Sequence, residues 1–475
     1  MKGTRYRTPA DVLRRAQEAV GIPLKNIDRS GRLATGKGAV GTVIEEGWFG
    51  YRPNPDSEPD FPEAGVELKV TPYLHTDKGI RAKERLVCDL INYMTEYKKT
   101  FETSDFWHKC STLLLMSYEH RPDVPKGEFT IDRAVLFRFP EEDRAIIQRD
   151  WETIMDKVRR GEAHLLSEGD TLYLAACTKG KNASSTRAQP FSPVPAKQRA
   201  YSLKPSYMTR VLNSYIFGDK PCEQIVKDWR LLEEQSFEDY IYEELRPWFG
   251  WRRKDLKHHF GVKGHPKHLS KILLGRMLGI QGKIARTEEF QKASIVPKTI
   301  RVRRDGFIEQ SMSLPPFDFI ELSQETWEES TLRNFLAPAR FLFVIFRQDA
   351  SGHFIFDRIQ FWNIPEDDLE EVHRVWERTV RTIRDGVRLI PTLNGVYNDL
   401  PKRSESFVAH VRPHASRSYY ILDPSRPWEA LGSGTLADAA QLPDGRWMTK
   451  QSFWLNNTYI QKQIEGPAEG RRFDR

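Results

Sequence analysis

The chain has 475 residues, of which 39% are hydrophobic and 29% charged, as in an ordinary globular protein with room for two or three domains. Its net charge of +7 and pI near 9.0 favour a polyanionic partner. No leader or membrane-length apolar run is evident, and the four cysteines are widely spaced. We therefore expect a cytoplasmic protein with reduced thiols, without a zinc site, disulfide framework or membrane anchor.

The first predicted element is a helix that begins at Pro9, with Thr8 as its N-cap and Gly21 as its stop. A glycine-rich stretch, 36–45, comes next, but it lacks the Lys-Ser/Thr ending of a phosphate loop. We expect it to enter a helix whose small residues pack closely, with Glu45 at the end of the apolar stretch formed by Val40, Val43 and Ile44. That carboxylate either faces a metal or lies on the helix surface.

The stretch 60–69 is the first with a clear chemical pattern. Residues 66–70 predict a short strand, on which Glu67 and Lys69 share one face. Asp60 lies upstream of Pro62 and Gly65, so the chain can bend its carboxylate back toward Glu67. Two converging carboxylates suit Mg²⁺, and a neighbouring lysine suits phosphodiester hydrolysis. The alternative is an edge strand with a solvated charged face.

Strands and helices then alternate. A helix is expected over 83–100, strands over 113–116 and 134–139, and a long helix from Pro140 to Val158. His108 and Lys109 lie directly before the first of these strands. This order indicates an α/β domain with a mixed sheet flanked by helices.

A basic polar loop, 177–185, comes after a predicted strand over 172–176, and basic, hydroxyl and aromatic groups recur at 197–207. Such donors suit phosphates and base edges, although the loop could also be an ordinary flexible one and Tyr207 a core residue. The residues predicted here to contact DNA are Lys179, Lys181, Arg199, Lys204 and Tyr207.

A change in composition near 218–222 predicts a domain boundary, which gives domains 1–220 and 221–475. The next stretch, 246–283, is strongly basic. Its four histidines are not accompanied by cysteines or paired acids, so a metal cluster is not expected. We expect a nucleic-acid surface, with a basic solvated helix as the alternative.

The second half repeats the first. Asp132, Pro140, Trp151 and Gly161 are spaced by eight, eleven and ten residues, and Asp357, Pro365, Trp376 and Gly386 have the same spacings. The segment 60–69 matches 289–298, and 102–104 matches 328–330.

Two differences between the copies concern the candidate site. Val296 stands at the position of Glu67, and Phe335 at that of Lys109. Because valine cannot ligate a cation, the second copy is expected to have lost the metal site. Basic groups remain there at Arg412, His414 and Lys450, which suggests binding without cutting.

Several motifs carry a family resemblance: Gly38-Ala-Val-Gly41-Thr-Val-Ile-Glu45, the 60–69 stretch, Glu102-Thr-Ser with His108-Lys109, Asp150-Trp151-Glu152, Lys179 with Asn182-Ala183, and Leu203-Lys204. The first half resembles the MutH mismatch-repair endonucleases. Through 410–414 and 448–454, the whole chain resembles their two-domain restriction relatives, the Sau-three-A group. One departure is Ser202, where that family has a tyrosine used in sensing adenine, so methylation sensitivity stays open.

The resemblance implies the restriction-endonuclease fold present twice, once active and once as a non-cutting effector. It implies a Mg²⁺-dependent type II restriction endonuclease that cuts both strands at GATC. Asp60, Glu67 and Lys69 would be catalytic with Glu45 and Lys109, and Asp60, Glu67 and Glu45 would hold the metal. A monomer that dimerises or loops on DNA and a DNA methyltransferase as genetic neighbour are expected. The alternatives are a MutH-like nickase and a non-cleaving GATC-binding regulator.

Overall fold

The computed structural model describes residues 6–34, 38–51, 58–76, 79–180, 185–219, 222–393 and 395–465. They form two compact units, the first comprising 1–245 with 274–296 and the second 246–273 with 297–475. The division thus differs from the predicted boundary at 220/221, because the chain returns to the first unit after the basic segment. The described helices include none that is long and apolar enough to cross a membrane. All four cysteines are free thiols, as predicted.

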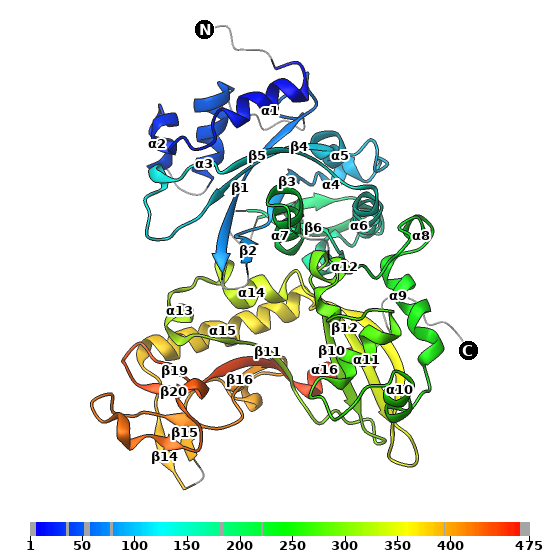
Figure 1. The fold of residues 1–475 in the computed structure, drawn as a ribbon, viewed down its shortest axis with the longest axis vertical. Coiled ribbons are helices and arrows are strands. Elements are labelled where there is room, and N and C mark those ends of the chain that lie inside the picture. The colour runs from blue at the N-terminus through cyan, green and yellow to red at the C-terminus, as the bar shows by residue number, and fades with distance from the viewer. Residues whose placement is uncertain are drawn as a thin grey trace. The chain divides into compact units, whose positions relative to one another are not determined.

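The described part of the first unit contains short helices, one long helix and three sheets, of which β7 with β8 is the smallest (Figure 1). Its helices are α1 (Pro9–Gln17), α2 (Leu24–Ile27), α3 (Ala39–Thr42), α4 (Tyr93–Glu96), α5 (Asp105–Cys110), α6 (Glu141–Arg159), α7 (Pro205–Val211), α8 (Leu231–Glu234), α9 (Phe237–Leu245), α12 (Glu288–Lys292) and the end of α11 (Leu269–Met277). Its strands are β1 (Glu67–Thr76), β2 (Gly79–Ala82), β3 (Leu86–Leu90), β4 (Thr112–Glu119), β5 (Arg133–Arg138), β6 (Leu174–Thr178), β7 (Thr186–Gln189), β8 (Ser192–Lys197) and β9 (Arg199–Leu203).

The main sheet of the first unit is mixed and has the order β2-β1-β4-β5. Strands β1 and β4 are parallel, with Glu67 opposite Leu113, and the other two pairings are antiparallel. A second, antiparallel sheet has the order β3-β9-β6. The predicted strands at 66–70, 113–116 and 134–139 and the long helix after Pro140 are confirmed, as is the α/β class.

Helices α1 and α3 pack on the main sheet and support the start of β1. Thr8 caps α1 by accepting the Asp11 amide at 3.2 Å, as predicted. Helix α3 continues into a π-helical segment, Val43–Phe49, which carries Glu45. At Gly47 an added Cβ would lie 2.5 Å from the Ile27 carbonyl oxygen, so only glycine fits there. This close approach fixes the segment that presents Glu45.

The prediction of a helix over 83–100 is wrong. The segment forms strand β3, then the four-residue helix α4. Strand β3 pairs with β9, residues more than a hundred positions later, and this non-local pairing overrides the helical spacing of the apolar residues. A bulge interrupts the pairing between Val87 and Asp89, which leaves Cys88 without an opposite partner on β9.

Helix α12 is anchored in the first unit, although it directly precedes the first strand of the second unit. Lys292 Nζ lies 2.7 Å from Asp143 Oδ1, and these side chains are 3% and 1% exposed. Tyr207 donates its hydroxyl to the same Asp143 carboxylate at 2.9 Å. Glu289 accepts the backbone N–H groups of Ile225 and Val226. These buried polar contacts explain why 274–296 belongs to the first unit.

The second unit contains α10 (Arg253–His259), α13 (Phe319–Gln324), α14 (Thr331–Leu336), α15 (Glu366–Asp385) and α16 (Asn457–Glu465). Its strands are β10 (Ile295–Val302), β11 (Met312–Phe317), β12 (Arg340–Gln348), β13 (Phe354–Trp362), β14 (Ile390–Thr392), β15 (Gly395–Tyr397), β16 (Ala409–Pro413), β17 (Tyr419–Tyr420), β18 (Leu431–Gly432), β19 (Ala439–Gln441), β20 (Trp447–Thr449) and β21 (Gln451–Leu455). Two three-stranded sheets, β10-β12-β13 and β11-β21-β16, form its frame.

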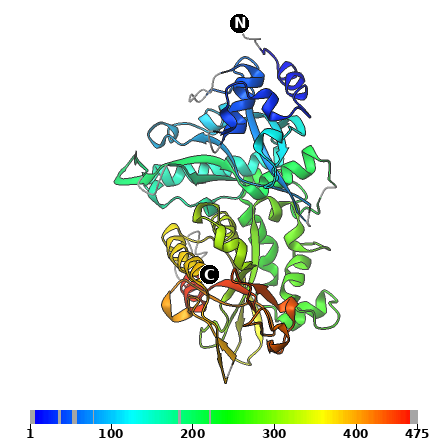
Figure 2. The same cartoon turned by 90° about the vertical axis from the view of Figure 1, so that its left-hand side faces the viewer.

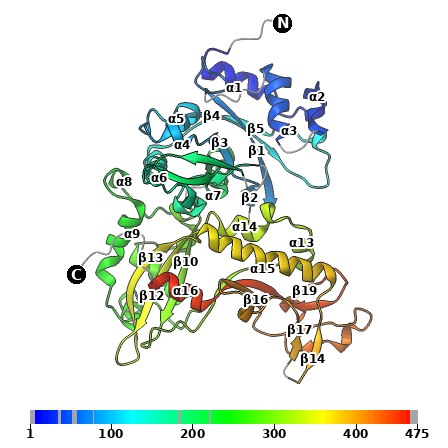
Figure 3. The same ribbon diagram turned by 180° about the vertical axis from the view of Figure 1, so that it is seen from behind.

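The long helix α15 of the second unit packs against α13 and β16 (Figure 3). The hairpin of β14 and β15 projects from the rest of that unit, as the views in Figure 1 and Figure 2 show. The basic segment after residue 246 contributes helix α10, which packs on β13.

The buried Lys292–Asp143 pair leads to a stability prediction. Lys292→Met leaves the Asp143 carboxylate without its cation in the core, which should lower the free energy of unfolding of the first unit by about 3 kcal/mol. Lys25→Met is the control, since Lys25 pairs with Glu128 at an exposed position and should change stability by less than about 1 kcal/mol. Urea unfolding measures both, and equal small effects would contradict the prediction.

Candidate active site

A tight turn folds Asp60 back on Glu67. Phe61 and Val66 exchange backbone hydrogen bonds across Pro62–Gly65, and Gly65 takes the left-handed conformation with φ +61°. The Asp60 amide donates to Glu67 Oε2 at 3.1 Å, and Asp60 Oδ2 accepts the Leu68 amide at 2.9 Å. The structure thus brings together the two carboxylates that the sequence paired.

Lys69 lies beside Glu67 on the same face of β1. Its Nζ donates to Glu67 Oε1 at 2.8 Å and to the Cys88 carbonyl oxygen at 3.3 Å. The side chains of Glu67 and Lys69 are only 4% and 17% exposed. Burial by itself would lower the pKa of Lys69, but the Glu67 carboxylate outweighs it and raises that pKa above its ordinary value. Lys69 is therefore a charged donor at neutral pH.

Glu45 joins the two carboxylates from the π-helical segment. Burial, followed by repulsion from Asp60 and a hydrogen bond shared with it, raises the pKa of Glu45 to about 7. Burial also raises the pKa of Glu67, with Lys69 opposing and Asp60 adding to the shift. The carboxylates of Glu45, Asp60 and Glu67 thus lie close together in one partly buried region.

The donor set fits a hard divalent cation. Among the described residues, no three His, Cys, Asp or Glu side chains already surround one point as a metal site. Mg²⁺ needs fewer, because it is usually held by one or two carboxylates and completes its shell with water and substrate phosphate. Asp60 and Glu67, with Glu45 near both, meet that requirement. Burial first, and the neighbouring carboxylates in addition, raise the pKa values of Glu45 and Glu67, and a bound cation would favour their charged forms.

Lys109 reaches the same region from the end of helix α5. Ser104 caps this helix by accepting the Trp107 amide at 3.0 Å, which sets the helix start and so the position of Lys109. The Nζ of Lys109 lies 3.6 Å from Asp89 Oδ1, with side chains 10% and 15% exposed. Its positive charge also lowers the pKa of Glu67, after the larger effects of burial and Lys69.

A pocket of about 710 Å³ opens next to Lys109. Its wall is formed by β3, by Lys109, and by the loop and strand residues Thr178, Lys179, Gly180, Ser185 and Gln198. Lys179 is exposed and its backbone amide donates to the Gln198 carbonyl at 2.8 Å. The structure therefore brings Lys179 near Lys109. Lys181, also predicted to contact DNA, lies outside the described residues.

Three predicted DNA contacts are buried instead. Arg199 is 1% exposed and its guanidinium donates to the carbonyl oxygens of Ala176 and Leu166. Lys204 is 1% exposed and donates to the Thr171 carbonyl. Tyr207 is fully buried against Asp143, which agrees with the core alternative. These three predictions need correction, because each side chain satisfies polar groups inside the first unit.

The predicted basic residues of the second unit lie along β16 and the start of β21. Arg412 is exposed, and its guanidinium carbon lies 4.6 Å from the centre of the Trp454 ring. His414 is exposed and its ring contacts Ser452 Oγ at 3.1 Å. Lys450 donates its Nζ to the Ala437 carbonyl at 2.8 Å. The structure brings these groups to neighbouring positions of one antiparallel pair.

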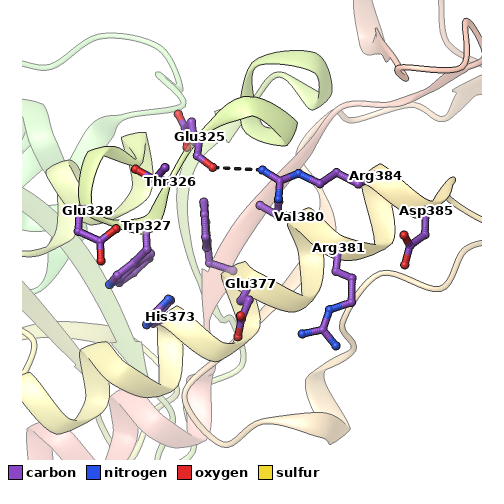
Figure 4. Close-up of a pocket in the computed structure, with 11 residues that line it drawn as sticks. Glu325, Thr326, Trp327, Glu328, His373, Glu377, Val380, Arg381, Arg384 and Asp385 are labelled. Carbon is purple, nitrogen blue, oxygen red and sulfur yellow. Dashed lines mark hydrogen bonds between the residues drawn. The ribbon is translucent and has the colours of Figure 1, made fainter. Parts of the chain in front are cut away.

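The second unit has a pocket of about 410 Å³ between residues 325–328 and helix α15 (Figure 4). His373 stacks on Trp327 at a ring distance of 4.5 Å, and Arg384 donates to the Glu325 carbonyl at 3.4 Å. Four carboxylates but only two guanidinium groups line it, so it would repel a phosphate backbone.

Sequence reasoning missed Asp89 and Cys88, whereas Gln198 falls within the stretch 197–207 that was predicted to contact DNA. Asp89 and Cys88 fall in the segment that was predicted as a helix, so their place opposite β9 was not foreseen. Gln198 lies between two strands that only the fold brings beside β3. The one signal in the sequence is an acid within a β-branched and apolar run, Val87 to Ile91.

The mixed sheet and the acid–lysine cluster at the start of β1 define a nuclease with a restriction-endonuclease-like fold. A profile of the DNA mismatch repair enzyme MutH matches residues 49–150, which include this cluster. MutH proteins of Shewanella woodyi and Serratia proteamaculans are 31% and 28% identical over 38% and 43% of this chain, and over 78% and 91% of their own lengths.

A match over nearly the whole chain identifies the family. The type II restriction enzyme Sau3AI of Staphylococcus aureus is 39% identical over 97% of this chain and 99% of its own length. The chain belongs to the Sau3AI family of type II restriction enzymes, and it is a DNA endonuclease.

Glu45 leads to a pH prediction. Between pH 4.5, its ordinary pKa, and about 7, the folded chain holds a proton on Glu45 that the unfolded chain has released. The free energy of unfolding should therefore fall by about 1–2 kcal/mol as the pH rises through this window without divalent cation. Thermal unfolding in EDTA measures it. Glu45→Gln should flatten the dependence, and an unchanged slope in that variant would contradict the assignment.

Proposed function

We propose that this endonuclease uses Mg²⁺ to hydrolyse both strands of duplex DNA at GATC, with its catalytic groups in the first unit. The observation that carries the proposal is the turn that folds Asp60 onto Glu67, with Lys69 hydrogen-bonded to Glu67 and Glu45 alongside. The GATC assignment rests on the motifs shared with the MutH and Sau3AI proteins. Family membership over nearly the whole chain supports it.

In the proposed mechanism Asp60 and Glu67 hold the cation, and Glu45 joins them once its proton has left. When bound, Mg²⁺ supplies a Lewis acid that polarises the scissile phosphate and makes an attacking water more acidic. Lys69 Nζ, charged at neutral pH, donates a hydrogen bond that orients the water and stabilises negative charge on the phosphate. Lys109 adds a second positive charge on the phosphate side.

We further propose that the second unit arose by duplication of the first. The sheet orders correspond, with β1-β4-β5 matching β10-β12-β13 and β3-β9-β6 matching β11-β21-β16. One buried contact recurs at matched positions. Tyr207 donates to Asp143 at 2.9 Å, and Tyr459 donates to Asp368 at 2.8 Å. A hydrogen bond repeated between matched helices supports common descent better than strand order alone.

The second copy lacks the electrostatics of catalysis. Lys298, at the position of Lys69, has Val296 in place of the carboxylate partner. Burial, with the nearby Lys271 charge adding to it, lowers the pKa of Lys298 to about 8, whereas the pKa of Lys69 is raised. Phe335 packs on Phe341 where the first unit has Lys109. These features support a non-cutting role for the second copy.

We assign DNA binding to the second copy through exposed Arg412 and His414 beside half-buried Trp454, where a cation and an aromatic ring lie together. An effector domain that binds a further GATC site, dimerisation or looping on DNA, and a neighbouring methyltransferase gene remain parts of the proposal. A MutH-like nickase is less well supported, because the MutH relatives match less than half of this chain.

Cleavage of a plasmid with several unmethylated GATC sites tests the proposal. Wild type with Mg²⁺ should give linear fragments whose ends map to GATC. Lys69→Met should lower the rate by at least about 100-fold, because it removes a charged donor at the phosphate. Lys298→Met is the matched control and should keep the wild-type rate. Nicked circles alone would favour the nickase, and binding without cleavage would favour a regulator.

The second unit gives a separate prediction. Arg412→Ala should weaken binding to GATC duplex and reduce the slope of log affinity against log salt by about 1, because one phosphate contact is lost. Arg426→Ala is the control, since Arg426 is exposed in the same unit but held by Asp423 and Glu429. Fluorescence anisotropy in Ca²⁺ over a salt series measures both. Equal slopes in the two variants would remove Arg412 from the interface.

A further inference from the structure

The bulge in β3 connects two lysines of the candidate active site. Cys88 lies in this bulge without an opposite residue on β9, and its carbonyl oxygen accepts Lys69 Nζ at 3.3 Å. The next residue, Asp89, lies 3.6 Å from Lys109 Nζ. One irregular turn of backbone therefore contacts Lys69 through its main chain and Lys109 through its side chain. Bulges of this kind re-aim side chains next to active sites.

The Asp89–Lys109 pair is close, and the Leu90 backbone amide also hydrogen-bonds to the Asp89 carboxylate. At 3.6 Å the two charges attract each other without a direct hydrogen bond, although both side chains are at least 85% buried. Lys109 must turn toward the phosphate to stabilise negative charge there. Asp89 would then keep a buried negative charge with a weakened partner, which is costly unless another donor approaches.

The pocket beside Asp89 has the chemistry of a base-reading site. Among the described residues that line it, Asp89 alone is acidic, and Lys109, Lys179 and Gln198 supply donors. In the major groove, aspartate accepts from exocyclic amino groups, such as cytosine N4, whereas lysine binds the acceptors of guanine. The carboxylate of Asp89 thus suits a donor group on a base, and Lys179 is suited to the acceptors of the same or the next pair.

We propose that Asp89 is a specificity-determining residue that couples base reading to phosphate binding. In the free enzyme its carboxylate holds Lys109. On cognate DNA it accepts a hydrogen bond from an exocyclic amino group of the site, and Lys109 turns to the scissile phosphate. The inference rests on the proposed function, since it takes the pocket to face a GATC duplex. The amino group is cytosine N4 or adenine N6, which share this chemistry.

The test is a double-mutant cycle between the enzyme and the DNA. Wild type and Asp89→Asn are assayed for single-turnover cleavage of a GATC duplex, of one with 2-pyrimidinone in place of cytosine, and of one with unsubstituted purine in place of adenine. Each analogue lacks a single exocyclic amino group. Any weakening of the duplex by the analogue affects both enzymes equally and cancels in the cycle.

The expected result is a loss of about 10- to 100-fold for wild type on one analogue, the size of one good base contact. Asp89→Asn should cleave the normal duplex more slowly than wild type by about the same factor. The analogue should slow Asp89→Asn little further. Coupling to 2-pyrimidinone identifies cytosine as the partner, and coupling to purine identifies adenine. The loss should fall on the cleavage rate constant more than on affinity measured in Ca²⁺, because Lys109 acts on the reacting phosphate.

Two results would overturn the proposal. One is that neither analogue slows wild type, a result that requires no protein variant and so cannot be caused by misfolding. The other is that the losses multiply for both analogues, which would make Asp89 only a structural partner of Lys109. Asp170→Asn is the matched control, since Asp170 forms a similarly buried pair with Lys157 outside the pocket, and its effect should show no coupling. Failure of wild type to cut the normal duplex would instead refute the proposed function.

Discussion

The site depends on keeping the carboxylate of Glu67 charged inside the protein. That side chain is 4% exposed, and burial alone would favour its neutral form. Three donors oppose this cost from fixed positions: the Asp60 amide, the Lys69 ammonium group and, at longer range, Lys109. The parallel pairing of β1 with β4, the Gly65 turn and the capped helix α5 together hold those donors around one carboxylate.

On the duplication that we propose, the second unit would show the effect of losing that carboxylate. Lys298 has Val296 in place of an acidic partner, and its pKa falls to about 8 through burial and the nearby Lys271 charge. The scaffold around it persists, down to the hydrogen bond between Tyr459 and Asp368. Packing and catalytic electrostatics are therefore separable in this fold, because the long helices and their tyrosine contacts do not depend on the acid–lysine cluster.

Local patterns predicted the parts of the structure that depend on near neighbours. Asp60, Glu67 and Lys69 are at most nine residues apart, so strand alternation and one turn were enough to bring them together. Predictions failed where the outcome depends on distant pairing. The apolar spacing of 83–100 indicates a helix, but pairing with β9 makes residues 86–90 a strand. Arg199 and Lys204 were predicted to contact DNA because their neighbours in the sequence offer no internal partner. The carbonyl groups that bind them come from residues 166–176, which only the fold brings close.

The return of the chain to the first unit bears on the order in which the protein is made. The ribosome adds Asp143 and Tyr207 well before Lys292, whose ammonium group neutralises the buried Asp143 carboxylate. At ordinary rates of synthesis, the residues from 208 to 292 take roughly 4–17 s. During that interval the first unit lacks one core ion pair while the basic segment is made. Completion of the first unit is thus tied to synthesis of the segment that leads into the second, and a chain that ends before residue 292 lacks the cation of this buried pair.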